Sequence, residues 1–550
     1  MKWWNVGGNQ MEENRAEWLS HLSNEIVSDA HGNLLDAYVV ALEGWRRGLT
    51  LRWHVKDSEK FKEMKTWFVD KPGQLFSLSS KDRTHYFFRT RGDKVTNEAV
   101  DIGRDKEKTK QALLKNGVSV PEGKQFTEEA SNEEIVDYVS HLGFPVVIKP
   151  TDGSFGRGVI SNITSSGEFE HSLEYVRGNL GYQDVIVEQY IPGKEYRIYV
   201  VGDKVVGAMN RIPPNVTADG INSIKALIEI KNEERGLNPR LVSCPILVNE
   251  EVEDFIGRKG YTLDTIPEKG LHVVLSDKTN ISLGGDPIDA LDEMPEYVKE
   301  AAVKALHAVQ GLEHGAVDLI VHQDNSNVYI IELNPTAQLG GLLYPIQGKS
   351  RDIPKAIIDY YFPETKGINT AEVNTFFDFH DVLDPLQSRD AFVTTVTPCP
   401  QEKLYTKKYI VSGDVLDIGY HRGLRKQAFE RFLHGYIMTL EEGDIEVVVG
   451  GTNPEMVDDF KNGFWEDEER GQVFEIQVDD YYEPIKVGFE IKTDLKTQIE
   501  DLKMYKQELE ATERELKKAE LKRRKYYSSL SWKATMPIRL VGSITKKLKN

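Results

Sequence analysis

FPVVIKPTDGSFGRG, residues 144–158, joins an apolar segment that ends in a lysine to a loop that contains three glycines. A Walker A loop places its lysine after the glycines, and a dinucleotide fold places its glycines before a helix. Here Lys149 precedes the glycines and the apolar segment VISNI follows Gly158, so the loop is predicted to join two strands. Such a hairpin can fold over a nucleotide and offer backbone N–H groups to its phosphates. From this stretch alone, an ordinary hairpin is the alternative.

Three charged residues elsewhere in the chain favour a nucleotide site. Lys106 stands at the entry of a predicted helix in GRDKEKTKQALLKNG. Glu188 and Glu195 flank a strand end in VIVEQYIPGKEYRIYVVG. A carboxylate can accept a hydrogen bond from an adenine amino group or hold both ribose hydroxyls, which is what nucleoside selection requires.

Acidic residues on two later apolar strands indicate a metal site. Asp318 lies in AVDLIV, and Glu332 and Asn334 lie in VYIIELNP. Because side chains alternate along a strand, Glu332 and Asn334 are predicted to share one face. Buried acids are costly unless they meet a cation, and Mg²⁺ suits one or two carboxylates together with phosphate oxygens. Strand-end acids in salt bridges are the alternative.

Composition excludes several classes of protein. With 550 residues, 39% of them hydrophobic and 29% charged, the chain is predicted to form two to four globular domains. Cys244 and Cys399 match no metal spacing or disulfide framework, so a reducing, cytoplasmic setting is expected. No apolar run is long enough to span a bilayer, and the amino-terminal residues do not resemble a secretion signal.

The net charge of −19 is unevenly distributed. Residues 517–550 contain eleven Lys or Arg and one Glu, whereas the rest of the chain is strongly acidic. An acidic body argues against nucleic-acid binding, while a basic tail fits an anionic lipid or polymer surface. A solubilising tail is the equal alternative.

Hydrophobic periodicity predicts a multidomain α+β protein. Within the first region, a helix is expected at LLDAYVVALEGWRRG, a strand at TLRWHV and a hairpin ending at THYFFRT. The predicted organisation is an α/β domain at 1–100, a nucleotide-binding domain at 101–366, a linker at 367–404, a small domain at 405–492, a helical or coiled-coil segment at 493–530 and a basic amphipathic tail at 531–550.

The last two segments leave several alternatives open. Leu495, Leu502, Leu509 and Leu516 recur every seven residues, but Lys506 and Glu513 occupy the alternate seam positions. A homodimeric coiled coil and a single amphipathic helix are therefore equal alternatives. In SLSWKATMPIRLVGSITKKLKN, apolar residues at helical spacing alternate with lysines, which fits a peripheral membrane helix or a helix on a partner subunit.

The order and spacing of these features resemble the ATP-grasp superfamily, and more narrowly the ATP-grasp domains of cyanophycin synthetases and bifunctional glutathione synthetases. RIPPNVTADGINSIKALIEIKN, NISLGGDPIDALDE and NPTAQLGGLLYPIQGKSRDIPKAIIDYYFP are similar to segments of that family. The family joins a carboxylate to an amine, an amino acid or peptide-like group, through an acyl phosphate made from ATP. NPTAQLGG departs from the family's NAAPG segment, and neither fused partner enzyme is present in the sequence, so the substrates do not carry over.

The resemblance implies a role for each candidate residue. ATP would be bound by Lys106, Lys149, Gly153, Ser154, Gly156, Gly158, Glu188, Ile191 and Glu195, with Glu188 on the adenine side and Glu195 on the ribose. Mg²⁺ would be held by Asp318, Glu332 and Asn334. A cation is also needed for the developing oxyanion, and Arg197, Arg211 and Lys278 are the catalytic candidates, with surface roles as the alternative.

The small domain resembles acylphosphatases, ferredoxin-like proteins with the motif GxVQGVGFR and a later GWVxN. The corresponding loop here reads GDVLDIGYHR, so His421 stands at the arginine position and Arg422 follows one place late. Thr439 stands at the asparagine position. A degenerate domain that binds an anionic group, or one that only positions the tail, is therefore favoured over an active hydrolase, although a shift of one residue in the loop could return Arg422 to the pocket.

The leading hypothesis is an ATP- and Mg²⁺-dependent carboxylate–amine ligase. An acylphosphatase with a vestigial ATP-grasp domain is the runner-up, and a nucleotide-binding scaffold without turnover is third. The tail is similar to the ends of some bacterial surface-polysaccharide glycosyltransferases, which gives a weak indication of an envelope or polymer pathway.

Overall fold

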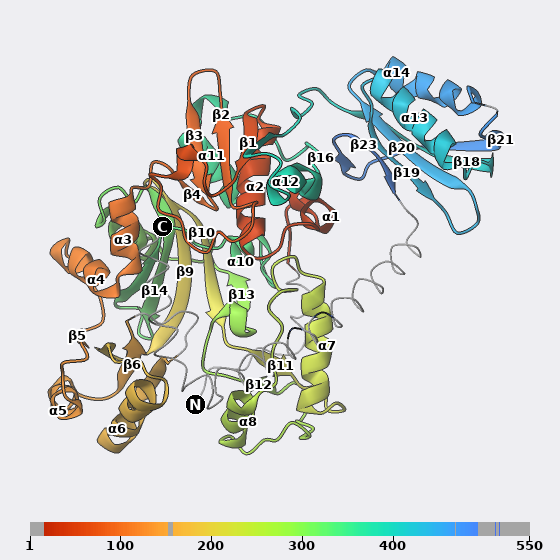
Figure 1. The fold of residues 1–550 in the computed structure, drawn as a ribbon. Coiled ribbons are helices and arrows are strands. Elements are labelled where there is room, and N and C mark those ends of the chain that lie inside the picture. Colours follow the sequence, from red (N-terminus) through yellow and green to blue (C-terminus); the bar gives the residue numbers. More distant parts are fainter. Residues whose placement is uncertain (1–15, 152–157, 468, 493–511, 513–515, 517–550) are drawn as a thin grey trace, which may run out of the picture. The chain divides into compact units, whose positions relative to one another are not determined.

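The computed structural model describes residues 16–151, 158–467 and 469–492, together with residues 512 and 516 (Figure 1). These residues divide into two compact units. Unit 1 comprises the described residues up to Lys403 together with Glu483–Val487, and unit 2 comprises those of Leu404–Tyr482 and those from Gly488 onward. The coiled-coil and tail predictions at 493–530 and 531–550 lie outside the described residues, apart from those two isolated positions.

The first sheet of unit 1 packs on a helix that is buried on every side. α2 (Asn33–Arg46) is buried from Leu35 to its end, including its charged residues Asp36, Glu43 and Arg46. It approaches the sheet so closely that a Cβ at Gly44 would lie 2.4 Å from Leu78 Cδ1. The predicted helix, strand and hairpin of this region are confirmed. The strand order is β17 (Val393–Thr395), β1 (Thr50–His54), β2 (Leu75–Ser79), β3 (Thr84–Phe88) and β4 (Arg91–Gly92).

The prediction of a linker at 367–404 is wrong for most of that segment. It supplies β17 to the first sheet, as well as β16 (Thr375–Phe376) and α12 (Phe379–Gln387). Phe377 and Phe379 are buried in the same core as α2, with ring contacts to Tyr38 and Trp53 among others. β16 also pairs in parallel with β22 (Ile485–Lys486), so the chain returns to unit 1 after residue 482. Burial of these aromatic side chains fixes a segment whose periodicity looked weak.

The central sheet of unit 1 is antiparallel and carries the candidate site. Its order is β13 (Asp286–Asp289), β10 (Lys204–Ile212), β9 (Gly193–Val201), β14 (His314–His322) and β15 (Val328–Asn334). Ile198, Val317 and Leu333 belong to a core on one face that is shared with the helices packed there. Those helices are α3 (Asn97–Arg104), α4 (Lys106–Lys115) and α9 (Glu296–His307).

On the other face, Tyr199, Met209 and Ala316 join the core of α2. The helices α10 (Gly340–Leu343) and α11 (Ile353–Tyr361) contribute to that core as well. The region predicted as a separate domain at 1–100 therefore shares one core with the central sheet. Removing this shared apolar surface from water stabilises both parts together.

A smaller antiparallel sheet holds the quoted loop. Its order is β5 (Gly123–Phe126), β8 (Val185–Gln189), β6 (Val146–Pro150) and β7 (Ile160–Ile163). β6 and β7 pair directly, so the loop does join two strands as predicted. Residues 152–157 of the loop lie outside the described residues. The sheet shares a core with α5 (Asn132–Leu142) and α6 (Ser166–Glu174).

A subdomain is inserted between the central strands β10 and β13. The hairpin β11 (Asn215–Thr217) and β12 (His272–Val274) packs with α7 (Ile224–Gly236) and α8 (Glu250–Gly257) around a core of its own. The remaining short helices are η1 (Ser20–Leu22), α1 (Asn24–Val27), η2 (Glu59–Phe61), the π-helical turn η3 (Tyr175–Asn179), η4 (Ile281–Leu283) and η5 (Pro363–Thr365).

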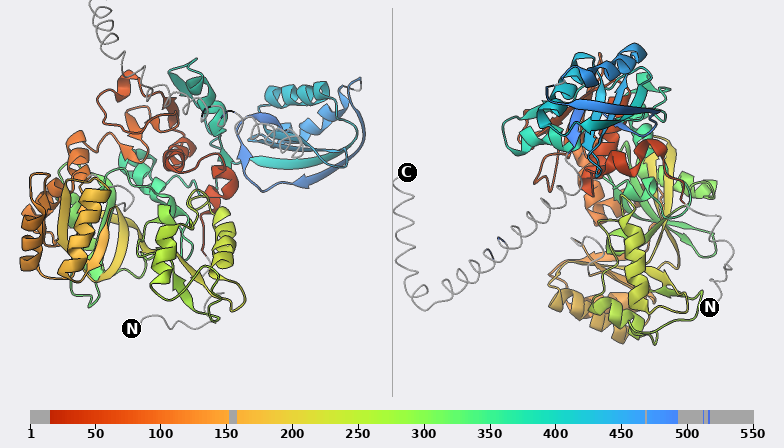
Figure 2. Two further views of the ribbon diagram at one scale, coloured as in Figure 1. Left: turned by 60° about the horizontal axis from the view of Figure 1, so that its bottom comes forward. Right: turned by 90° about the vertical axis from the view of Figure 1, so that its right-hand side faces the viewer.

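Unit 2 has the predicted ferredoxin-like fold. The sheet order is β21 (Gln472–Asp480), β18 (Tyr405–Asp414), β20 (Ile445–Gly451), β19 (His434–Thr439) and β23 (Phe489–Lys492). α13 (Ile418–Glu430) and α14 (Pro454–Asp459) cover one face, as Figures 1 and 2 show, and the turn η6 (Phe460–Trp465) shares their core. Among the described helices of the whole chain, none has the length and apolar character that crossing a bilayer requires.

Candidate active site

Strand register places a row of charged side chains on one face of the central sheet. Asp318 on β14 stands opposite Arg197 on β9 and opposite Glu332 on β15. Directly opposed residues of antiparallel strands point to the same face. Glu195 joins the row because it lies two residues from Arg197, and Asn334 joins it because it lies two residues from Glu332. The candidate metal ligands and a candidate catalytic arginine are thus neighbours.

Two arginines pair with Asp318 and Glu195 in this row. Arg197 binds Asp318 in a bidentate pair, with Nε 2.7 Å from Oδ1 and Nη2 2.8 Å from Oδ2. Arg211 donates to Asp318 Oδ2 at 3.1 Å and to Glu195. Burial alone would raise the pKa of Asp318, but Arg197 and Arg211 outweigh it and lower that pKa. Asp318 is therefore a negatively charged group at neutral pH, and it lies at the centre of the row.

Glu332 is in the opposite electrostatic situation. Burial, and next the negative charge of Asp318, raise its pKa above the usual range. Arg197 and Lys106 counter this only in part. Two carboxylates directly opposed across strands repel each other unless a cation lies nearby. A divalent cation would relieve that repulsion.

The residues present fit a magnesium site. Asp318, Glu332 and Asn334 offer two carboxylates and an amide oxygen, a donor set that suits Mg²⁺ when phosphates and water complete it. Asn334 Nδ2 is buried and has no hydrogen-bond partner among the described residues. The described residues contain no group of three or more His, Cys, Asp or Glu side chains placed to bind a metal by themselves. The remaining ligands would therefore come from a phosphate-bearing substrate and from water.

The nucleotide candidates on the smaller sheet also lie together. Lys149 on β6 is 8% exposed, and its Nζ lies 2.5 Å from Glu188 Oε2 on β8. Register explains the pair, because Val147 stands opposite Glu188 and Lys149 points to the same face two residues later. Lys106 Nζ donates to the backbone oxygens of Pro150 and Thr151, at 3.0 and 3.1 Å. Both lysines thus stand at the base of the loop.

Only part of the predicted loop can be placed. Gly158 has φ +75°, and a Cβ there would lie 2.8 Å from Pro150 Cγ, so this position requires glycine. Gly153, Ser154 and Gly156 lie outside the described residues. The buried Ile191 lies in the turn between β8 and β9, where the neighbouring Tyr190 N–H donates to Pro145 O. This turn links Glu188 on the smaller sheet to Glu195 on the central one.

Thr279 is a site residue that sequence reasoning missed. Its hydroxyl donates to Glu195 Oε2 at 2.7 Å, so Glu195 is held by Thr279 and Arg211 together. The only available signal was its position directly before the family-like segment NISLGG, which begins at Asn280. The adjacent Lys278 points elsewhere and pairs with Glu251 on α8. Of the three catalytic candidates, the structure brings Arg197 and Arg211 together and separates Lys278 from them.

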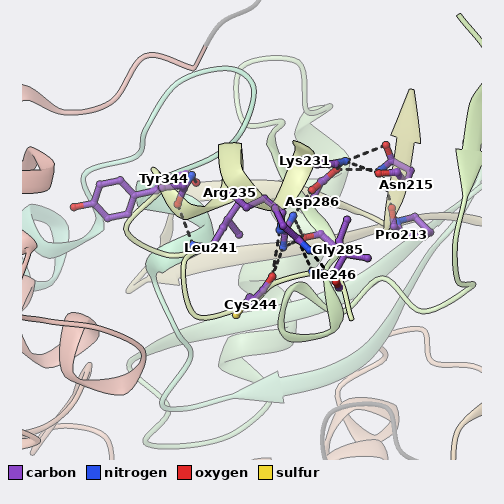
Figure 3. Close-up of polar contacts among 12 residues, drawn as sticks. Pro213, Asn215, Lys231, Arg235, Leu241, Cys244, Ile246, Gly285, Asp286 and Tyr344 are labelled. Atoms are coloured by element: carbon purple, nitrogen blue, oxygen red, sulfur yellow. Dashed lines mark hydrogen bonds and ion pairs between the residues drawn. The ribbon is translucent and has the colours of Figure 1, made fainter. Parts of the chain in front are cut away.

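A buried ion-pair hub fixes the strand end that carries Arg211. Asp286 accepts from Arg235 at 2.6 Å and from Lys231 at 2.5 Å, both on α7. Figure 3 shows Arg235 reaching the backbone oxygens of Cys244 and Gly285 as well. Because Ile212 stands opposite Asp286 in the sheet, the hub ties α7 to the residue that follows Arg211. The inserted subdomain is thereby anchored beside the charged row.

The loop of unit 2 differs from a phosphate cradle in its charges as well as its sequence. Asp417 stands where the acylphosphatase motif has a glycine, and its carboxylate accepts the Tyr420 N–H at 3.1 Å. His421 is buried and its Nε2 lies 2.8 Å from Val415 O. Arg422 is exposed and makes no hydrogen bond or ion pair with the described residues. Thr439 is half-buried at the end of β19, opposite Ile445. A phosphate here would meet a carboxylate.

Comparison with known proteins matches one segment of each unit to a family. Residues 103–223 match the RimK-like ATP-grasp domain, and residues 407–491 match acylphosphatase. The chain is 33% identical over 258 residues to the glutathione biosynthesis bifunctional protein GshAB of Desulfotalea psychrophila, which covers 46% of this chain and 33% of that protein. It is 34% identical over 280 residues to the cyanophycin synthetase of Trichormus variabilis, which covers 50% and 31%. A bifunctional glutathione synthetase structure from Pasteurella multocida aligns with a TM-score of 0.42 and 31% identity, over 53% of this chain and 41% of that one.

The chain therefore contains an ATP-grasp domain and an acylphosphatase-like domain, which confirms both resemblances. It spans about a third of the length of the two curated relatives. Neither matched family segment includes the region before residue 103, although that region shares its core with the central sheet.

Proposed function

We propose that this protein is an ATP- and Mg²⁺-dependent ligase that joins a carboxylate to an amine through an acyl phosphate. The observation that carries the proposal is the row formed by Arg197, Arg211, Asp318 and Glu332 on the central sheet. Such a row can bind metal-complexed phosphates and stabilise charge on a phosphoryl group or an oxyanion. The ligases among its relatives support the same chemistry.

The reaction would proceed in two steps. An oxygen of the carboxylate substrate attacks the γ-phosphorus of ATP, and the bond from that phosphorus to the β–γ bridging oxygen breaks to release ADP. The amine nitrogen then attacks the acyl carbon, the bond to the phosphate oxygen breaks, and the nitrogen loses a proton. Bound Mg²⁺ supplies positive charge that offsets the charge of the phosphates.

The side chains of the site have distinct roles in this proposal. Lys149 binds ATP phosphates from the smaller sheet, together with the loop amides. Asp318, Glu332 and Asn334 hold Mg²⁺. Arg211, whose buried Nε has no partner among the described residues, stabilises the oxyanion that forms as the amine attacks.

ADP release tests this proposal. Full-length protein with ATP, Mg²⁺ and panels of amino acids, peptides and cell-wall fragments should release ADP in a substrate-dependent manner. Lys149→Ala should abolish that release. Lys304→Ala is the control for loss of a lysine side chain, because Lys304 donates to the backbone oxygen of Gly117 from α9, which packs on the face of the central sheet opposite the charged row. Equal ADP release by the wild type and the Lys149 variant would refute the proposal.

Hydrolysis of acyl phosphates by unit 2 is the second candidate function, and the loop geometry opposes it. Asp417 occupies the Tyr420 N–H and brings negative charge to the cradle. An active hydrolase beside a ligase would also destroy the acyl phosphate that the ligase makes. We therefore assign unit 2 a binding or positioning role. A third candidate, a nucleotide-binding scaffold, predicts ATP binding without turnover on any substrate of the panel.

The cellular context is part of the proposal. We expect a cytoplasmic protein whose basic tail, residues 517–550, contacts an anionic surface. The pathway would be one that builds the cell envelope or a polymer. The heptad segment could also join two copies of the chain in a homo-oligomer. Vesicle flotation of the full chain and of a chain that ends at residue 492 tests the tail. Flotation of neither chain with anionic lipid would remove the membrane part.

A further inference from the structure

The loop of residues 335–341, called here the closing loop, connects two parts of the candidate site. It starts directly after Asn334, at the end of β15, and it runs into α10. α10 contacts β10 and β13. A Cβ on Gly341 would lie 2.8 Å from Met209 Sδ on β10. The closing loop thus reaches from a candidate metal ligand to the strand that carries Arg211.

Three residues of the N-terminal region hold the closing loop by hydrogen bonds. Asp36 Oδ1 accepts the Leu339 N–H at 2.8 Å, and the Thr90 hydroxyl donates to Ala337 O at 3.2 Å. Asn33 Oδ1 accepts from the side-chain amide of Gln338 at 3.0 Å.

A fourth hydrogen bond holds the closing loop from the inserted subdomain. Arg240 Nη2 donates to Gln338 Oε1 at 2.9 Å, so both ends of the Gln338 amide are engaged. Arg240 also packs tightly, because a Cβ at Gly340 would lie 2.3 Å from its Cδ. The closing loop is therefore fixed from two sides.

Asp36 is the most constrained member of this set. It is 2% exposed, and no Lys, Arg or His nitrogen of the described residues forms an ion pair with its carboxylate. Burial raises its pKa to about 7, although the Leu339 N–H, Arg240 and Arg89 lower it. Burying a carboxyl group costs free energy. Such a cost is expected where function requires it, and here the carboxyl group fixes the backbone of one loop.

We propose that Asp36 is a positioning residue of the ATP-grasp site, and that the N-terminal region forms part of this site by holding the closing loop. This inference rests on the proposed function. Asp36 touches neither metal nor substrate; it acts through Leu339 and the closing loop on Asn334 and the substrate side of the site. The region before residue 103 thus has a function beyond packing.

Loop position matters because small displacements near a reacting centre are costly. A misplacement of about 1 Å can lower a rate by about 10²-fold. Asp36→Ala removes the acceptor for Leu339, whereas Asp36→Asn keeps an oxygen at that place. Asp378→Ala is the control for general destabilisation of the same core, since Asp378 also accepts a backbone N–H, that of Asp381, and in addition pairs with Lys486, but at the start of α12, which contacts β17 and β1.

The test combines turnover with two readouts that need no turnover. In full-length protein, Asp36→Ala should lower kcat for ADP release by about 10²-fold. Amide hydrogen exchange in a peptide that covers 335–344 should become faster. The affinity for a nonhydrolysable ATP analogue should fall in the presence of Mg²⁺ but not in its absence. Asp36→Asn should stay close to wild type in kcat, in amide exchange and in Mg²⁺-dependent affinity. Asp378→Ala should change none of these three quantities.

The outcomes separate this inference from the proposed function. If wild-type protein turns over no substrate, the proposed function fails, while hydrogen exchange and Mg²⁺-dependent binding still decide the role of Asp36. If Asp36→Ala leaves loop exchange and Mg²⁺-dependent binding at wild-type values, the positioning role is refuted. It is refuted equally if Asp378→Ala produces the same changes, because the effect would then be general destabilisation.

Discussion

At the scale of single residues, Asp318 lies between Arg197 and Arg211, and this pairing determines what each charged group of the row can do. Asp318 is neutralised on both oxygens, whereas Glu332 makes no hydrogen bond with the described residues. A buried ion pair is weak evidence for stability, because desolvation offsets its attraction. A need for stability therefore does not explain the row, which fits the proposed binding of phosphate and metal.

Two of the candidate cations, Arg211 and Lys278, are expected to differ in importance. Arg211→Ala should lower ADP release by about 10² to 10³-fold, the effect of removing one donor to a developing oxyanion. Lys278→Ala should change it by less than about threefold, because Lys278 is paired with the exposed Glu251. Steady-state kinetics of both variants, with Arg211→Lys to retain the charge, measure this. Equal losses in the two variants would contradict the assignment.

Asp36 is expected to make stability depend on pH. Its folded-state pKa is raised from 3.8 to about 7 by burial, so the unfolded chain releases this proton at lower pH than the native state does. Stability from this group is present below pH 4 and is lost as pH rises towards 7, at about 1.4 kcal/mol per pKa unit. The melting temperature of Asp36→Asn should therefore rise relative to wild type between pH 5 and pH 8. A constant difference over that range would show that the carboxylate titrates normally.

At the scale of elements, strand periodicity predicts some site contacts and not others. The common face of Glu332 and Asn334 follows from alternation within one strand. The pairing of Asp318 with Arg197 does not, because it depends on the register between β14 and β9, which lie about 120 residues apart in sequence. Thr279 was missed for the same reason, since its partner Glu195 lies on a distant strand.

The turn before β13 is expected to tolerate no side chain. A Cβ at Gly285 would lie 2.6 Å from Thr279 O and 3.0 Å from Ile212 O, so Gly285→Ala must shift the backbone beside Thr279 and Arg211. We expect a loss of about 1–3 kcal/mol in unfolding free energy and a fall in ADP release. Gly236→Ala on α7 meets nothing within 4 Å and should be neutral or slightly stabilising. Thermal unfolding of both variants checks the contrast, and a neutral Gly285→Ala would contradict it.

The loop between β18 and α13 allows a gain-of-function experiment. Asp417→Gly with His421→Arg removes the carboxylate from the cradle and restores the arginine position. In a Lys149→Ala background without ATP, this double variant should hydrolyse acetyl phosphate faster than the Lys149→Ala parent. Asp417→Asn, which keeps an acceptor for Tyr420, should not. A parent that already hydrolyses acetyl phosphate at the rate of the double variant would show that the native loop is active.

At the scale of the whole molecule, the two units are interleaved in sequence. Residues Glu483–Val487 belong to unit 1, although the segments on both sides of them belong to unit 2. In these residues β22 pairs with β16, and Lys486 Nζ lies 2.6 Å from Asp378 Oδ2. The classes of both domains could be predicted from local motifs. The role of 367–403 could not, because its partners β1 and β22 are remote in sequence and its own periodicity is weak.

Truncation should show that the stability of unit 1 depends on residues Glu483–Val487. A chain that ends at residue 403 loses β22 and the Lys486 ion pair, so unit 1 should melt at lower temperature than in a chain that ends at residue 492. Binding of a nonhydrolysable ATP analogue should persist in both chains, since the nucleotide candidates lie between residues 106 and 334. Calorimetry and titration measure the two properties. Equal melting of unit 1 in both chains would contradict the structural role of β22.

The fate of the carboxylate oxygen tests the central claim most directly. A carboxylate substrate that stimulates ADP release is labelled with ¹⁸O and incubated with ATP, Mg²⁺, the amine and full-length protein. If an acyl phosphate forms, one ¹⁸O passes to inorganic phosphate in each turnover, and Lys149→Ala abolishes both the transfer and the ADP. Unlabelled phosphate released together with ADP, or ADP release that no carboxylate of the panel stimulates, would contradict the account.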